Sequence, residues 1–376
     1  MRREARGLAP PSAAVPVPLL SPTVRSEVRG SRFEAQDSKF RKPRTSNFEP
    51  SSYSVLDTVG RRGALTYEFE REGPRTVLMR SSCTSPWHHF PPSYLDDSGC
   101  AYTWLVNPSG GLVGGDHVLV EAQLHAGTHV LMTSPSANRV YRSLSEAAVQ
   151  EIRLSVGPDA RLEWLPEVTI PFAGSRFRQS IHVDLAPGAT VVLWDAMASG
   201  RVARQERWAF TSIENEICIR GLAPPSEAVP VPLPFIRGLP AEKGDSPGAG
   251  QSPPARRGQA PIRRAPVPCV ERYCLAPGQL PESVGLVGSW DYVASLFVIG
   301  DAVGADVWKR LAAALADILE QRPGLVLGGV STPAVPGVVV KLVAKSAPDL
   351  TDTFEALWAA VRDNLWNLPV PNLRKY

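Results

Sequence analysis

Apolar and polar residues alternate along much of the chain between residues 53 and 220. The alternation is clearest over residues 118–124, 152–156 and 181–185. A period of two is the pattern of a β-strand that buries one face. Each of the three segments is followed by residues rich in Gly, Pro or Asp, which favour tight turns, and then by another apolar run. The pattern therefore predicts a series of strand–turn–strand units.

The units recur at a nearly constant interval along the sequence. Their turns follow Leu124, Val156 and Leu185, which lie 32 and 29 residues apart. Repeated units of this length bury their apolar faces against one another when they stack. We therefore predict an elongated, β-layered, β-solenoid-like body of stacked hairpins.

Two helices are predicted near the C-terminus. Apolar residues fall on one helical face over 306–321 and again over 349–366, which is the period of an amphipathic helix. Ser346 precedes the second segment and forms a possible capping box with Asp349. Trp358 and Trp366 share one face of that helix, and we interpret both as core residues, the alternative being a docking stripe. The predicted fold class is mainly β, with two C-terminal α-helices packed on the β body.

Two segments rich in Pro show no hydrophobic period, and they share one short element. Residues 6–19 recur at 220–233 with one difference, Ala13 in place of Glu227. Proline at this density excludes helix interiors and central strands. The predicted organisation is a disordered basic extension over 1–52, the first part of the β body over 53–220, a flexible insertion over 221–268 and the rest of the body with both helices over 269–376.

Composition and charge narrow the function classes. A formal net charge of +3 is too small to indicate a nucleic-acid partner, and five scattered cysteines without zinc-site spacing indicate reduced thiols. The sequence shows no signal-peptide core and no apolar run of the ~20 residues that a membrane span needs. We therefore expect a cytoplasmic protein with neither a nucleic-acid nor a membrane partner.

The strongest local motif is the glycine-rich segment 110–116, GGLVGGD. It lacks the Lys-Ser/Thr of a phosphate-binding P-loop, and the residues after it are predicted to form a strand rather than a helix. Glycines that permit positive φ at a tight connection between strands explain the motif better.

This motif and the segments after it resemble the UreD (UreH) family of urease accessory proteins. The matching segments, in the order of the family, are 110–116, 131–143, 162–172, 183–189, 194–195, 200–201 and 206–210. The resemblance is close over about 60–220, thinner over 270–376 and absent from 1–50 and 221–268. Asp195 departs from the family pattern, which more often has Glu at this place.

The resemblance implies a urease maturation chaperone rather than an enzyme. Similar proteins bind apo-urease and recruit the accessory protein UreF, and through UreF they engage the GTPase UreG. The expected assembly is a hetero-oligomer with two copies of the chain on a UreF dimer. No cofactor is expected to be held stably. Nickel in transit would need spaced, weak oxygen or nitrogen ligands.

The carboxylates within the matched segments are the candidates for a transient nickel path. They are Glu163, Asp195, Asp116 and Glu167, with Glu206 nearby in the motifs. If Glu163 points into the β body, its charge needs a partner or water, and a hydrated passage would supply one. Alternatively, these carboxylates cap turns, pair with arginines or face solvent.

Other features are open to two interpretations. Tyr141 and Arg142 are candidates for partner binding, because Tyr and Arg are favoured interface anchors, but Tyr141 could equally pack in the body beside a solvated Arg142. His125 and His129 flank a turn, and we interpret both as ordinary surface histidines.

Two other function classes remain open on the sequence alone. A β-solenoid hydrolase could use Glu163 and Glu167, which share a face if the strand is regular, although Pro166 between them makes that doubtful. The duplicated element favours the second class, a proline-motif adaptor.

Overall fold

The computed structural model describes residues 62–221, 268–277 and 288–373. The chain divides into two units, 1–42 and 43–376, and the first lies outside the described residues. The same holds for the predicted extension over 1–52 and for all but the ends of the predicted insertion over 221–268.

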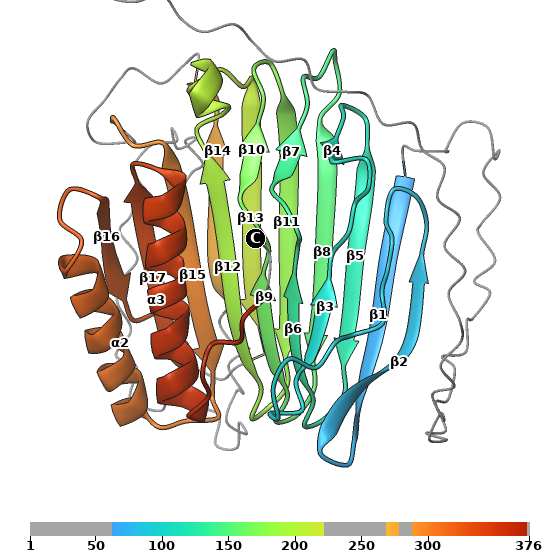
Figure 1. The fold of residues 1–376 in the computed structure, drawn as a ribbon, viewed down its shortest axis with the longest axis vertical. Coiled ribbons are helices and arrows are strands. Elements are labelled where there is room, and N and C mark those ends of the chain that lie inside the picture. The colour runs from blue at the N-terminus through green and yellow to red at the C-terminus, as the bar shows by residue number, and fades with distance from the viewer. Residues whose placement is uncertain (1–61, 222–267, 278–287, 374–376) are drawn as a thin grey trace, which may run out of the picture. The chain divides into compact units, whose positions relative to one another are not determined.

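Two β-sheets form the body of the described chain (Figure 1). The first sheet contains, in spatial order, β14 (Cys269–Leu275), β13 (Ser212–Arg220), β11 (Arg176–Leu185), β8 (Ala148–Val156), β5 (His117–Leu124), β1 (Arg62–Glu72) and β2 (Arg75–Cys83). The second contains β16 (Val326–Ser331), β17 (Gly337–Ala344), β15 (Tyr292–Gly300), β12 (Thr190–Ala198), β10 (Thr169–Pro171), β7 (Asn138–Val140) and β4 (Gly111–Leu112). It also includes β9 (Arg161–Leu165), β6 (His129–Thr133) and β3 (Ala101–Trp104).

The chain passes back and forth between the two sheets, and strands of successive coils pair in parallel. β5 pairs with β1 and β8 in the first sheet, whereas β6 pairs with β3 and β9 in the second. The turn at Gly127 (φ +67°) joins β5 to β6 and is therefore a corner between sheets. The predicted mainly β, solenoid-like body is confirmed. The prediction that the two strands flanking each turn pair as a hairpin is wrong, because those strands lie in different sheets. Alternation of apolar residues shows that one face of a strand is buried, but it does not show which sheet the strand joins.

Two neighbouring chain segments of the second sheet are each interrupted partway along their length, and the two gaps lie side by side. β6 and β7 are separated by residues 134–137, and β9 and β10 by residues 166–168. Each gap contains a proline, Pro135 or Pro166, which cannot donate a hydrogen bond to a neighbouring strand. β12 contains no proline and runs past the interruption, pairing with β9 through its first half and with β10 near its end.

Two helices cover the outer face of the second sheet (Figure 1). They are α2 (Ala305–Glu320) and α3 (Ala347–Trp366), and a short 3-10 helix, η1 (Val202–Arg204), follows β12. The Ser346 side chain accepts a hydrogen bond from the Asp349 N–H, as the capping box predicts. Trp358 is 2% exposed, which confirms it as a core residue, whereas Trp366 is only partly buried against the same core. One apolar core lies between the sheets and a second lies between the second sheet and the helices.

No helix within the described ranges is both long and apolar enough to cross a membrane.

Candidate functional site

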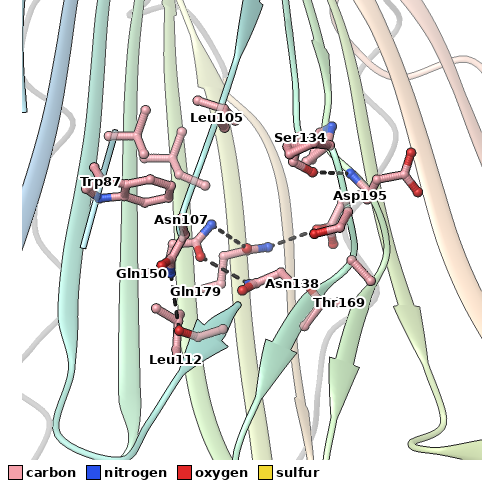
Figure 2. A pocket seen from close by; sticks show the side chains of 18 of the residues that line it. Trp87, Leu105, Asn107, Leu112, Ser134, Asn138, Gln150, Thr169, Gln179 and Asp195 are labelled. Atoms are coloured by element: carbon pink, nitrogen blue, oxygen red, sulfur yellow. Dashed lines mark hydrogen bonds between the residues drawn. The ribbon is translucent and has the colours of Figure 1, made fainter. Parts of the chain in front are cut away.

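A polar cavity lies at the level where the second sheet is interrupted (Figure 2). Its lining includes Ser134 and Asn138 from the edges of one gap, Thr169 from the edge of the other, and Gln179 from the first sheet behind them. The centres of water molecules can occupy about 70 Å³ of the cavity. One buried water needs ~10–15 Å³ of such space, so the cavity has room for several waters.

A row of three side-chain amides runs across the first sheet, and two of them, Gln150 and Gln179, line the cavity. Gln150, Gln179 and Asn215 occupy paired positions on β8, β11 and β13, so their side chains share the face that looks toward the second sheet. The Gln179 side-chain amide donates to Asn215 Oδ1 at 3.1 Å, and Asn138 donates to Gln150 Oε1 at 3.2 Å. The row places several neutral oxygen and nitrogen groups across the interior of the body.

Asp195 faces this row from β12. Its two carboxylate oxygens accept hydrogen bonds from Gln179 Nε2 at 2.9 Å and from Asn215 Nδ2 at 2.8 Å. Burial raises the pKa of Asp195 to about 6, and the negative charge of Glu271 acts in the same direction, while the two amide donors oppose the rise. The residue as a whole is only partly buried, and it lines the cavity. It can therefore exchange a proton at weakly acidic pH.

Glu167 is the second predicted carboxylate that lines the cavity. It lies in the gap between β9 and β10, and its backbone N–H donates to Ser134 Oγ at 2.8 Å in the neighbouring gap. Asp116 is elsewhere: its Oδ2 accepts from the Val113 N–H at 2.8 Å within the glycine-rich turn. Asp195 and Glu167 thus share one cavity and Asp116 does not line it.

Glu163 lies on the opposite face of the second sheet from the cavity. Its neighbours Leu162 and Trp164 pack between the sheets, so Glu163 points toward α3 and is 0% exposed. It accepts hydrogen bonds from Trp358 Nε1 at 2.5 Å and Arg362 Nη1 at 2.6 Å. Glu163 is therefore separated from Asp195 by the thickness of the sheet, and the four predicted carboxylates do not form one continuous row.

A third partner of Glu163 is His129, whose Nε2 lies 2.8 Å from Oε1. Burial opposes ionisation of Glu163, but the hydrogen bond and charge of His129 and the charge of Arg362 outweigh it and hold the pKa of Glu163 below its usual value. His129 is 3% exposed, so its interpretation as a surface histidine is wrong. His125 is partly exposed and contacts Glu68.

Arg362, which was not predicted from the sequence as a site residue, is 0% exposed. A signal was present, because Arg362 follows Trp358 by four residues and so lies on the same helical face. Its Nη2 is also 3.6 Å from Asp96 Oδ2. The network ties α3 to the second sheet through buried charges.

Two residues of this network, with Cys100 beside them, form a cluster of potential metal ligands in the described part of the chain. Cys100, His129 and Glu163 are buried, and their candidate ligand atoms lie within 4.8 Å of one another. However, both oxygens of Glu163 already accept hydrogen bonds, one of them from a guanidinium group. A cation here would have to displace Arg362, so the arrangement fits an anchor for α3 better than a metal site.

The geometry is also against a hydrolase that uses Glu163 and Glu167. The strand ends at Leu165, and Pro166 begins the gap, so the regular spacing that would put both carboxylates on one face is lost. Glu163 is enclosed beneath α3, whereas Glu167 lines the cavity. The two carboxylates do not share a groove.

The candidate partner residues lie at the end of the body near the glycine-rich turn. The Tyr141 ring packs edge-on against Phe172, with ring centroids 5.1 Å apart, and its hydroxyl lies 3.5 Å from the Gly110 carbonyl oxygen. Arg142 is exposed. Glu206 is paired with Arg201, with Nε and Oε2 2.7 Å apart. Tyr141 therefore packs in the body, Arg142 is accessible to a partner, and their role in binding stays a prediction.

The chain matches the family model described as UreD urease accessory protein over residues 61–225 and 258–375. It is 42% identical to UreD of Deinococcus radiodurans over 166 residues, which are 43% of this chain and 59% of the relative. It is 40% identical to UreD of Methylibium petroleiphilum over 152 residues, 40% of this chain and 51% of the relative. These two matches thus span little more than half of each relative. A longer match, 29% identical over 329 residues, covers 86% of this chain and 98% of UreD 2 of Streptomyces griseus.

Proposed function

We propose that this chain, which belongs to the family of UreD urease accessory proteins, is a maturation chaperone that assists nickel insertion into apo-urease. The observation that supports this role is the polar cavity between the sheets, which is lined by two acidic residues and by side-chain amides. An accessory family also agrees with the prediction of a function other than catalysis.

The chemistry of the cavity suits an ion that must be passed on. Asp195 supplies carboxylate oxygens, Glu167 is a second acidic residue of the lining, and Gln150 and Gln179 supply amide oxygens. These are hard, weakly held ligands for Ni²⁺, and the cavity has room for waters that stay with the ion. A thiolate cage would hold the ion too tightly for release. The cavity therefore provides transient contacts and no permanent cofactor site.

The charge of Asp195 can be coupled to the passage of the ion. With a pKa of about 6, the carboxyl is mostly ionised at neutral pH but is close enough to neutrality to take up a proton. An arriving divalent cation would bind the ionised carboxylate, or displace the proton from the protonated minority, and after its departure Gln179 and Asn215 would again stabilise the carboxylate by hydrogen bonds. Asp195 would thus exchange protons and metal ions without leaving an unpaired buried charge.

The proposed partners are apo-urease, UreF and UreG, with two copies of the chain on a UreF dimer. Arg142 is exposed beside Tyr141 and offers a cationic contact for one of these partners.

The test is a gene deletion in cells that express urease, followed by restoration with the wild-type gene. Urease activity and the nickel bound to purified urease should both fall on deletion and recover together. Asp195→Asn should restore less of both, because the amide cannot carry the charge. Asp184→Asn is the matched control, since Asp184 is an exposed carboxylate on β11. Urease that stays fully loaded with nickel after deletion would refute the proposed function.

A further inference from the structure

A cysteine and a histidine meet where β2 ends. Cys83 is the last residue of β2, and the chain then turns so that His89 Nδ1 lies 3.2 Å from Cys83 Sγ. Both side chains are half-buried. All five cysteines and six histidines of the chain fall within the described ranges, and there no other hydrogen bond joins the two residue types. The contact is therefore a distinctive feature of this loop.

The separation of the two atoms matches that of two ligands on one metal ion. Metal–sulfur and metal–imidazole bonds of about 2.3 Å and about 2.0–2.1 Å place S and N about 3.1 Å apart at a right angle and about 3.5 Å apart at a tetrahedral angle. The observed 3.2 Å lies between these limits. An ion can therefore bridge Sγ and Nδ1 with only small movements of the side chains.

A third polar group lies on the same face of the β1–β2 pair. Leu65 pairs with Cys83 and Tyr67 pairs with Ser81, so Tyr67 and Cys83 are diagonal neighbours. Tyr67 is 3% exposed, and its hydroxyl has no hydrogen-bond partner in the described structure. Burial raises the pKa of this hydroxyl, and the nearby Cys83 raises it further. Tyr67 therefore places a buried hydroxyl on the strand face that carries Cys83, and a buried polar group normally has a hydrogen-bond partner.

The loop that holds the pair also forms part of the cavity wall. Trp87 lies two residues before His89, and its ring lines the polar cavity (Figure 2). The neighbouring His88 is held by its backbone N–H on the Val106 carbonyl oxygen, 2.9 Å away, and its side chain is exposed. The Cys83–His89 pair is thus next to the cavity in sequence but outside its lining.

We propose that Cys83 and His89 form a binding site for a borderline divalent metal ion, with water or an incoming ligand in the remaining positions. Sulfur and imidazole ligands together suit Ni²⁺ and Zn²⁺ rather than Mg²⁺ or Ca²⁺. Binding releases one proton, from the thiol, while Nδ1 contributes its lone pair and the second ring nitrogen keeps its hydrogen. The choice of nickel as the natural ion rests on the proposed function, but metal binding by the pair does not.

The test is a titration of the purified, untagged full-length chain with Ni²⁺ alone, under reducing conditions and without chelators. Thiolate-to-nickel charge-transfer absorption reports the sulfur ligand, and equilibrium dialysis gives the stoichiometry. We expect one sulfur-bound nickel per chain, no charge-transfer band in Cys83→Ser, and binding at least about tenfold weaker in His89→Gln. Cys274→Ser and His88→Gln are the matched controls, because both residues are exposed and outside the pair, and both should bind like the wild type.

A charge-transfer band that persists in Cys83→Ser, or a wild-type chain with no sulfur-bound nickel in excess Ni²⁺, would overturn the proposed site. Circular dichroism of each variant shows whether a loss of binding comes from misfolding. His89→Gln removes only a ligand, so weaker binding by a folded variant supports the site even if Cys83→Ser fails to fold. The urease deletion test is separate: nickel-loaded urease after deletion refutes the proposed function and leaves this site standing.

Discussion

Arg362→Met tests how α3 is held on the second sheet. Arg362 is 0% exposed, its Nη1 is 2.6 Å from Glu163 Oε1, and its Nη2 is 3.6 Å from Asp96 Oδ2. Methionine keeps an unbranched apolar side chain in the same space but has no charge. The substitution leaves Glu163 buried with His129 and Trp358 as its remaining partners.

The expected loss can be worked from the burial of the pair. Removing one partner of a buried ion pair costs about 3–5 kcal/mol, because the other charge remains in a poorly solvated place. Glu163→Gln should cost less, about 1–3 kcal/mol, since Arg362 keeps its contact with the partly exposed Asp96. The double variant should lose less stability than the sum of the two, because neither charge is then left alone.

The assay is equilibrium unfolding in urea near neutral pH, with hydrogen exchange of the α3 amides as a local probe. Arg153→Met is the control, since Arg153 pairs with Glu121 and Glu151 at the surface with 56% of its side chain exposed, and it should cost ~1 kcal/mol or less. If Arg362→Met costs no more than Arg153→Met, or if the effects of Arg362→Met and Glu163→Gln simply add, the buried pair does not anchor the helix.

The same pair gives a pH dependence of known sign. The pKa of Glu163 is lowered in the folded chain, so its stabilising contribution is complete above the pKa of an unfolded glutamate, about 4.3. That contribution is lost as the pH falls through the lower folded pKa. Exchange protection of α3 should therefore weaken at acidic pH in the wild type and depend less on acidity in Glu163→Gln.

Three further predictions concern other parts of the fold. The pKa of Asp195 is raised to about 6, so the folded chain binds this proton more tightly than the unfolded chain. The free energy of unfolding should therefore decrease as the pH rises from about 4 to about 6 and then level off. Asp195→Asn should flatten this slope in urea unfolding measured across that pH range. Ser346→Ala removes the side-chain cap of α3 and should cost about 1 kcal/mol by thermal unfolding, whereas Ser346→Asp should retain most of the stability. Gly127→Ala meets no atom within 4 Å but must adopt φ +67°, so it should cost about 1–2 kcal/mol in urea unfolding, and a neutral effect would contradict the assigned turn geometry.

The repeat of strands and turns was predictable because its information is local. Alternation over 118–124 marks one buried face whether the strand joins the first sheet or the second. The sheet assignment depends on partners one coil away, such as the pairing of Val120 with Ile152, and no rule within a single unit specifies them. For the same reason, a turn that connects the two sheets cannot be distinguished in the sequence from the turn of a hairpin.

The candidate site was predictable only in part. Asp195 and Glu167 were candidates from the matched segments, and both line the cavity. The row of Gln150, Gln179 and Asn215 carries no motif and follows only from the strand register. The partners of Glu163 are more remote still: Arg362 lies 199 residues away in the sequence. The position of a residue across a sheet depends on the whole topology, which periodicity does not contain.

The two faces of β12 connect the cavity to the helical layer, which affects the substitutions that the protein can accept. Neighbouring residues of the strand face opposite ways: Asp195 lines the cavity, while the Trp194 ring packs against Phe354 of α3 with centroids 4.6 Å apart. One strand is therefore the only backbone between the two side chains. Because packed interiors transmit small changes of volume, a substitution beneath α3 also shifts the backbone that positions Asp195. Substitutions in the helical layer and in the cavity should therefore be coupled, although within the described residues none of the cavity lining comes from α2 or α3.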